Sequence, residues 1–250
     1  MKLNVKTNTD EDVISIFDIE VPIKLKKKIP TGLDYFDTAI GGKGFTPSMV
    51  TLFTGTPGAG KTTMMLELAD SMTKQGCNVL FNTAEESLYQ LKMTVERLKL
   101  RNGFKAGQET NVNRLLENCK NLMDDDPSKP FFFIVDSLQC LTMTDNPSKH
   151  SATMTQKCLQ KITDFCKEHY CNAIVIGQVT KNGNMAGRNV LKHMVDSMIS
   201  LSVEEKDEDL KGCRVLETLK NRFGGAGHIA FLLLRKHGFK ELAIVQSSNS

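Results

Sequence analysis

Four apolar runs along the chain each end in a small or polar residue, and stretches with helical periodicity separate them. Unbroken runs of large apolar and β-branched residues are typical of strands buried on both faces of a parallel sheet. We therefore expect strands and helices to alternate from residue 49 to residue 178. The expected strands are residues 49–54, 78–83, 131–136 and 173–178, and the expected helices are residues 61–76, 88–100, 112–123 and 151–169. This alternation predicts an α/β fold with a mainly parallel central sheet flanked by helices.

The pattern changes in the last quarter of the chain, where helical periodicity gives way to short apolar runs. These runs predict strands at residues 198–203, 213–220, 229–234 and 242–245. The acidic stretch at residues 204–209 lies between the first two runs and predicts a solvated hairpin tip. The sheet is therefore expected to have a β-rich C-terminal edge.

The sequence predicts one domain with short extensions at both ends. Residues 1–28 form an N-terminal arm, residues 29–245 the domain, and residues 246–250 a tail. The arm carries one small apolar patch, Val13–Phe17, between an acidic and a basic cluster. Two interpretations remain open: the patch docks on this domain or a neighbouring subunit, or the arm is a solvated tail with a short edge strand.

The first expected strand leads directly into a glycine-rich segment, and a helix follows. Gly55–Thr62 matches the pattern G-x-x-x-x-G-K-[ST], a phosphate-binding loop when a strand precedes it and a helix follows it. Glycines let backbone N–H groups point at the phosphates, the Lys61 side chain reaches them, and the Thr62 hydroxyl is a ligand for Mg²⁺. A chance match is the alternative, which the flanking elements disfavour. The expected nucleotide-binding residues are Gly55, Thr56, Pro57, Gly58, Ala59, Gly60, Lys61, Thr62 and Thr63.

A carboxylate stands at the end of another expected strand. Asp136 follows five large apolar residues, and ligands of open α/β sheets lie at the carboxyl ends of the strands. With Thr62, Asp136 is therefore expected to hold Mg²⁺, directly or through water. The alternative is that Asp136 only caps the next turn.

Composition and charge bear on the partners and location of the protein, and they indicate no further kind of site. The net charge of +3 is too small to indicate nucleic acid by itself, so DNA binding must rest on local clusters. The seven cysteines contain no C-x-x-C pair and the five histidines have no metal-ligand spacing, which disfavours a zinc site. We expect reduced thiols, a cytoplasmic location and no membrane span, because no apolar run approaches about 20 residues.

Several separate segments together resemble the ATPase core of the RadA/Sms family, within the RecA/DnaB/KaiC superfamily. The most specific is Lys220–Gly224, which reads K-N-R-F-G. The others are Ile29–Gly32, the phosphate loop, Ala84–Ser87, Asp136 with Ser137, Gly177–Lys181 and His193–Asp196. The resemblance covers about residues 29–245 and implies a RecA-like fold. It also implies ATP bound between the subunits of a homo-oligomeric ring or filament.

The resemblance also implies roles for particular residues. Glu85, rather than its neighbour Glu86, would orient the attacking water, and Gln178 would sense the γ-phosphate, where RadA-like proteins usually carry His. Lys220 and Arg222 would be finger residues that reach a neighbouring subunit's ATP, as Lys61 reaches its own; the alternative is a pair of solvated cations.

The segment after Gln178 would face single-stranded DNA in this family. It carries Lys181, Arg188 and, just beyond, Lys192, which would bind the DNA backbone electrostatically unless they are ordinary surface cations. The expected function is an ATP-hydrolysing motor acting on single-stranded DNA in recombination or repair. A KaiC-like regulatory ATPase or scaffold, or a DnaB-like helicase core, is the alternative. The family's N-terminal zinc module and Lon-like domain have no counterpart in these residues, so branch migration is not carried over.

Overall fold

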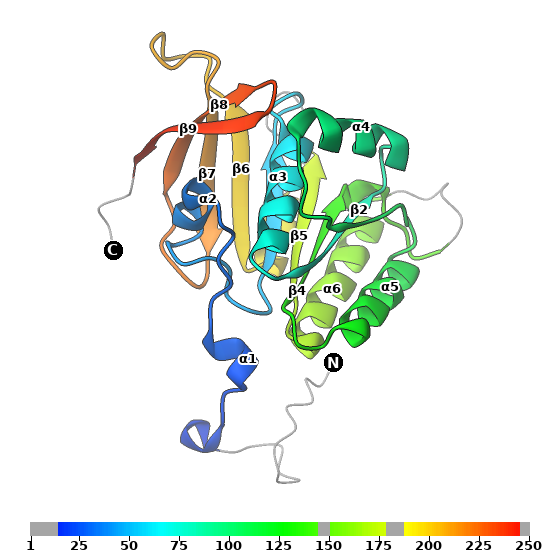
Figure 1. The fold of residues 1–250 in the computed structure, drawn as a ribbon. Coiled ribbons are helices and arrows are strands. Elements are labelled where there is room, and N and C mark those ends of the chain that lie inside the picture. Colours follow the sequence, from blue (N-terminus) through cyan, green and yellow to red (C-terminus); the bar gives the residue numbers. More distant parts are fainter. Residues whose placement is uncertain (1–14, 145–150, 179–187, 246–250) are drawn as a thin grey trace.

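A computed structural model describes residues 15–144, 151–178 and 188–245 (Figure 1). Its centre is one nine-stranded sheet with the strand order β3-β2-β4-β5-β1-β6-β7-β8-β9. All neighbours from β3 to β6 pair in parallel, and β6 to β9 pair antiparallel. The strands are β1 Val50–Gly55, β2 Asn78–Thr83, β3 Lys105–Gly107, β4 Phe131–Asp136, β5 Asn172–Gln178, β6 Ser197–Val203, β7 Arg214–Asn221, β8 Ile229–Arg235 and β9 Gly238–Val245. The expected mainly parallel sheet with a β-rich C-terminal edge is confirmed.

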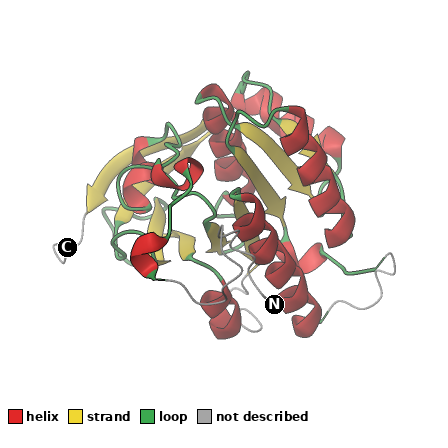
Figure 2. Ribbon diagram, turned by 90° about the horizontal axis from the view of Figure 1, so that it is seen from below, coloured by secondary structure: helices red, strands yellow, loops and turns green. Residues whose placement is uncertain are grey.

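Helices cover both faces of the sheet (Figure 2). One core layer joins α2, α3 and α4 to one face, and the other joins α5, α6 and α7 to the opposite face. Alternate residues of β4 divide between the layers: Phe132 and Ile134 lie in the first, and Phe131, Phe133 and Val135 in the second. The helices are α2 Asp34–Ala39, α3 Lys61–Lys74, α4 Leu88–Leu98, α5 Val112–Asp125, α6 Ala152–His169 and α7 Arg188–Met194. A 3₁₀ turn, η2 Leu138–Cys140, follows β4.

The parallel register brings the carboxyl ends of the central strands to one edge. Gly55 lies beside Gln178 across the β1–β5 pair, and Thr83 lies beside Asp136 across the β2–β4 pair. Residues that are far apart in the chain therefore meet where β1 gives way to the glycine-rich segment. We call this side of the sheet the carboxyl edge.

The described part of the N-terminal arm leaves most of its apolar side chains exposed. It contains η1 Ile16–Asp18 and α1 Ile23–Lys26, and no strand within residues 15–28. Ile16 is 72% and Phe17 is 94% exposed, which excludes these two side chains from the core of this chain. The rest of the apolar patch, from Val13, lies outside the described residues. The arm and tail boundaries stay predictions.

Aromatic packing between the sheet and the α2 side gives a direct test of the core. Phe132 is fully buried and its ring centroid lies 4.9 Å from that of Phe45. Replacing Phe132 by Ala is expected to lower the free energy of unfolding by about 3–5 kcal/mol, because the cavity adds to the lost apolar burial. Urea denaturation measures the change. Phe223, which is 45% exposed, is the control, and Phe223→Ala should cost under about 1 kcal/mol.

Candidate functional site

The glycine-rich segment after β1 forms an open loop at the carboxyl edge. Gly58 has a φ of +76°, and a Cβ placed there would meet nothing within 4 Å. Gly60 has a φ of +101° and immediately precedes α3, so the N-terminal end of that helix faces the loop. Lys61 folds back over the loop and donates to the carbonyls of Gly55 at 3.0 Å and Thr56 at 3.2 Å. The loop therefore has the shape and the donors that a phosphate group requires.

Two oxygen groups from distant segments meet beside this loop. The Thr62 hydroxyl donates to Asp136 Oδ2 at 2.7 Å. Burial raises the pKa of Asp136 to about 6, and the negative charges of Glu85 and Glu86 act in the same direction; the Thr62 hydrogen bond and Lys61 oppose them. A hydroxyl and a carboxylate are oxygen ligands of the kind Mg²⁺ prefers, so this pair fits that ion. Their role as metal ligands stays a prediction.

The Lys61 ammonium is part of the same electrostatic cluster. Burial lowers its pKa, while the charges of Asp136 and Glu85 raise it. Polyphosphate charge at the loop would favour the charged lysine further, because an opposite charge nearby stabilises it.

Glu85 is the better placed of the two candidate glutamates. Its Oε1 accepts hydrogen bonds from the Ser137 hydroxyl and, at 2.5 Å, from Gln178 Nε2, and Cys140 Sγ lies 3.8 Å away. Glu86, by contrast, makes its hydrogen bonds to other described residues through its backbone, with Thr83 at 3.0 Å and Gln108 at 3.5 Å. The structure thus brings the Glu85 carboxylate to the ends of β4 and β5, and its catalytic role stays a prediction.

Gln178 links this cluster to the segment expected to touch DNA. Its backbone N–H donates to Gln139 Oε1 at 3.2 Å, and its carbonyl accepts from Gln139 Nε2 at 3.4 Å. Of the three expected DNA contacts, Lys181 lies outside the described residues, Arg188 is the first residue of α7, and Lys192 lies within that helix. Because Lys181 and the Arg188 side chain lie outside what the structure describes, the DNA contact stays a prediction.

The two expected finger residues lie on the side of the sheet opposite the carboxyl edge, where the amino ends of the parallel strands are. Gly55 pairs with Leu201 of β6, whereas Asn221 of β7 pairs with Ser197 at the other end of β6. Four residues of β6 separate these two pairings, so the finger residues lie roughly 15 Å from the start of the loop of the same chain. Within the chain, Lys220 donates to the carbonyls of Lys192 at 2.7 Å and Val195 at 2.6 Å, and Arg222 pairs with Asp196 at 3.2 Å. These contacts hold both residues away from their own chain's phosphate loop.

One arginine that the sequence did not single out does contact the loop. Arg214, at the start of β7, donates through Nε to the Ala59 carbonyl at 3.3 Å and through Nη1 to the Gly212 carbonyl at 2.6 Å. From the sequence it is an ordinary cation beside a polar turn. Arg214 reaches the carboxyl edge because it follows the turn after β6 and pairs with Val203 at the end of that strand.

A phosphate loop at the carboxyl edge of a mainly parallel sheet, with a carboxylate on a nearby strand, defines an ATPase domain of the RecA-like class. The ATPase family described as KaiC matches residues 29–103 and 99–228. The chain therefore belongs to the KaiC family of ATPases, a family that binds ATP. The similarity to RadA expected from the motifs is also confirmed.

Relatives and a solved structure agree with this assignment. The chain is 32% identical over 214 residues to the DNA repair protein RadA of Aquifex aeolicus, and 31% identical over 225 residues to that of Haemophilus influenzae. These matches cover 85% and 89% of this chain but only 46% of each relative, so the chain spans about half their length. A solved ATPase domain shares the fold, with a TM-score of 0.70 at 16% identity over 87% of this chain and 92% of that one. Within the described residues, no helix is both long and apolar enough to cross a membrane.

Proposed function

We propose that this chain is the ATP-hydrolysing core of a motor that acts on single-stranded DNA in recombination or repair. The observation that carries the proposal is the hydrogen bond from Gln178 to Glu85. It joins the expected hydrolytic carboxylate to the strand that leads into the Lys181 segment. The DNA repair proteins that align with most of this chain support the same function.

The proposed hydrolysis uses groups that already converge at the carboxyl edge. Loop N–H groups and Lys61 bind the triphosphate, and Lys61 exchanges its two loop carbonyls for phosphate oxygens. Thr62 and Asp136 would hold Mg²⁺, which would neutralise phosphate charge. Glu85 accepts a hydrogen bond from the attacking water and holds it in line, while Ser137 and Gln178 fix its carboxylate.

Gln178 is the proposed link between the nucleotide and DNA. Loss or gain of the γ-phosphate would change the charge beside Glu85 and therefore the strength of the Gln178 hydrogen bond. Because an amide does not titrate near neutral pH, this link should not depend on pH in the way a histidine would.

The position of Lys220 and Arg222 supports a homo-oligomer with ATP at subunit interfaces. A head-to-tail contact places the carboxyl edge of one subunit against the opposite edge of the next. Residues roughly 15 Å from their own loop can then reach the loop of a neighbour. The rotation that relates neighbouring subunits decides whether such contacts form a closed ring or an open filament.

The membership of the KaiC family favours a second candidate, a regulatory ATPase or scaffold whose cycle changes protein partners. A helicase core is a variant of the first candidate, the DNA motor. The likeness to the solved ATPase domain supports only the fold of such a core. DNA dependence of hydrolysis separates the scaffold from the other two.

Single-stranded DNA is expected to stimulate ATP hydrolysis at low salt, and the stimulation should decline steeply as salt rises, because binding is mainly electrostatic. Phosphate release, measured at several salt concentrations with and without oligonucleotide, tests this. Lys181→Ala and Lys192→Ala should each reduce the log–log salt slope by about 1.

Two control variants accompany this experiment. Lys61→Ala should abolish hydrolysis with or without DNA. Lys129→Ala changes an exposed cation that is paired with Asp126 at 2.7 Å, and it should leave the slope unchanged. If DNA at low salt produced no stimulation, the motor proposal would be wrong and the scaffold favoured.

A further inference from the structure

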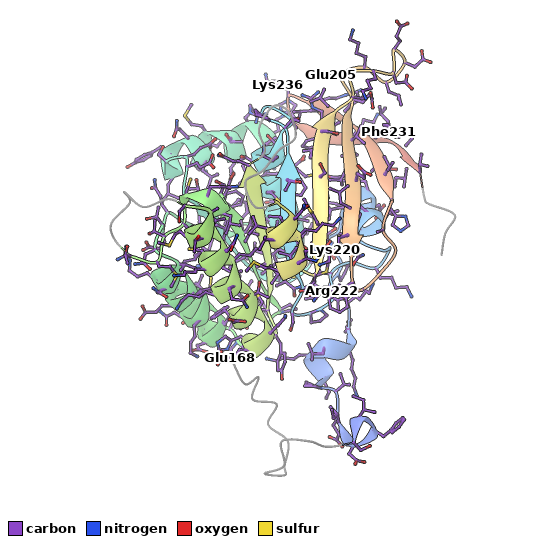
Figure 3. The ribbon with its side chains drawn as sticks, turned by 180° about the vertical axis from the view of Figure 1, so that it is seen from behind. Glu168, Glu205, Lys220, Arg222, Phe231 and Lys236 are labelled. Carbon is purple, nitrogen blue, oxygen red and sulfur yellow. The ribbon has the colours of Figure 1, made fainter. Side chains whose placement is uncertain are left out.

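The hairpin between β8 and β9 reaches back across the molecule to the phosphate loop. A Cβ placed on Gly60 would lie 2.9 Å from Phe239 Cζ and 3.0 Å from Leu234 Cδ2. The two apolar side chains therefore pack directly against the backbone of the loop, on the residue before Lys61. Figure 3 shows Lys236 of the hairpin turn near one edge of the sheet, with Lys220 and Arg222 lying toward the other.

The same hairpin is fastened to α3 by one carboxylate. Both oxygens of Glu67 accept a hydrogen bond from the Phe239 N–H, at 3.2 and 3.1 Å. A Cβ at Gly238 would overlap the Glu67 carboxyl group, 1.7 Å from Oε1, and Gly238 has a φ of +115°. The turn can therefore approach this close only because residue 238 is a glycine.

Two polar contacts join the hairpin turn to α4. Arg97 donates to the Lys236 carbonyl at 2.8 Å, and His237 Nδ1 lies 2.9 Å from the Arg97 carbonyl oxygen. The helix α4 begins three residues after Glu85, with a capping box made by Ser87 and Gln90. The hairpin thus braces the loop that precedes Lys61 against both helices that start at the site.

We propose that Glu67 is a positioning residue for ATP binding: by holding the Phe239 N–H it keeps the β8–β9 hairpin against Gly60, and the braced loop presents its N–H groups to the triphosphate. The inference rests on the ATP-binding part of the proposed function and is independent of DNA. Glu67 is not a catalytic residue, because its carboxylate faces the hairpin rather than Lys61.

Because Glu67 is largely buried, its pKa lies in a range where its protonation state can be changed by ordinary changes of pH. Burial raises the pKa of Glu67 to about 7, while the Phe239 hydrogen bond and the Arg97 charge lower it. Tyr35 of α2, Glu241 of β9 and His237 of the turn are further titratable groups on this side. Burial raises the pKa of Tyr35, and the charges of Glu67 and Glu241 raise it further. Because the pKa is above the unfolded value of 4.5, the stabilising contribution is complete below that value and is lost as pH rises through about 7.

Two substitutions separate the hydrogen bond from the charge. Glu67→Gln keeps a carbonyl acceptor for Phe239 without charge, whereas Glu67→Leu removes the acceptor at similar size. Glu67→Leu is expected to weaken ATP binding about tenfold with a smaller change in kcat, and Glu67→Gln should stay within about twofold of wild type. Glu96→Gln, an exposed carboxylate on α4 paired with Lys92, is the matched control and should change nothing.

Hydrogen exchange of the nucleotide-free protein tests the brace without depending on ATP. After correction for intrinsic rates, Glu67→Leu should raise exchange in residues 55–62 as well as in residues 234–239. In the wild-type protein, exchange in both segments should increase between about pH 5 and about pH 7 and level off above that, because Glu67 loses its proton over this range, and Glu67→Gln should remove this pH dependence. Phe239→Leu, which withdraws the ring from Gly60, is a milder variant in case Glu67→Leu folds poorly.

The outcomes are distinct. Faster exchange in the hairpin alone, with the loop and ATP affinity unchanged in Glu67→Leu and Phe239→Leu, would overturn the inference. Faster exchange in both segments, with rescue by Glu67→Gln, would support it. If wild-type protein did not bind ATP, the proposed function would be wrong, and the exchange data would still decide whether the hairpin braces the loop.

Discussion

Replacement of Glu85 by Gln is expected to lower kcat for ATP hydrolysis by about 10²–10⁴-fold while ATP still binds. The amide has nearly the same shape and can still accept a hydrogen bond from Ser137, but it cannot accept a proton or hold the attacking water as strongly. Phosphate release measures hydrolysis, and calorimetric titration with ATP measures binding. The expected result is a lost rate with an affinity within a few-fold of wild type.

Glu86→Gln is the natural control for this variant. Glu86 adjoins Glu85 in sequence, yet its hydrogen bonds to other described residues are those of its backbone. We expect its rate to stay within about threefold of wild type, because its charge raises the pKa of Asp136 less than that of Glu85 does. An unchanged rate in Glu85→Gln, or a comparable loss in Glu86→Gln, would move the catalytic role away from Glu85.

Loss of Arg222 is expected to reduce hydrolysis by about 10³-fold or more, as for arginine fingers that act in trans. Mixing two inactive variants shows whether the action is in trans. Subunits with Arg222→Ala retain Glu85, and subunits with Glu85→Gln retain Arg222. A random equal mixture should recover about a quarter of the wild-type rate, because one interface in four then combines an intact site with an intact finger.

This experiment also distinguishes the finger from a purely structural arginine. Arg222 pairs with Asp196, whose other oxygen accepts from the Val50 N–H at 3.1 Å, so its removal leaves a buried carboxylate with one partner fewer. Thermal melts of each variant measure that effect, and Lys240→Ala on β9 serves as an exposed-cation control. No recovery in a mixture that assembles would show that Arg222 acts within its own chain or only supports the fold.

The elements that could be predicted from the sequence are those with a long or strongly patterned local signal. The strands β1, β2, β4 and β5 end within one residue of the expected positions, because each is a continuous apolar run bounded by a small or polar residue. The short helices α2 and α7, of six and seven residues, could not be predicted in this way, because so few residues cannot show helical periodicity. Tertiary contacts anchor them instead: Asn221 donates to the Ile40 carbonyl beside α2 at 3.0 Å, and Lys220 donates to the carbonyls at the end of α7.

The residues of the candidate site also fall into those that the sequence predicts and those that it does not. The phosphate loop is contiguous, so its residues and their chemistry are readable from one segment, and Asp136 stands out because a carboxylate ends a buried run. Arg214 and Glu67 carry no such signal. Each is an ordinary charged residue in its own segment. Arg214 meets the loop because the turn between β6 and β7 lies at the carboxyl edge, and Glu67 meets the brace because the β8–β9 hairpin returns to α3.

By itself the sequence determined that this chain has an alternating α/β fold with a phosphate loop after its first strand, because backbone preference and apolar patterning act over a few neighbouring residues. The tertiary structure alone decided which groups share the site. Parallel register placed Gln178 beside Gly55 and Asp136 beside Thr83, and the hydrogen bonds to Ser137 and Gln178 drew in Glu85 rather than Glu86. It also placed Lys220 and Arg222 a strand length from their own loop, since an antiparallel strand that starts at one edge must end at the other.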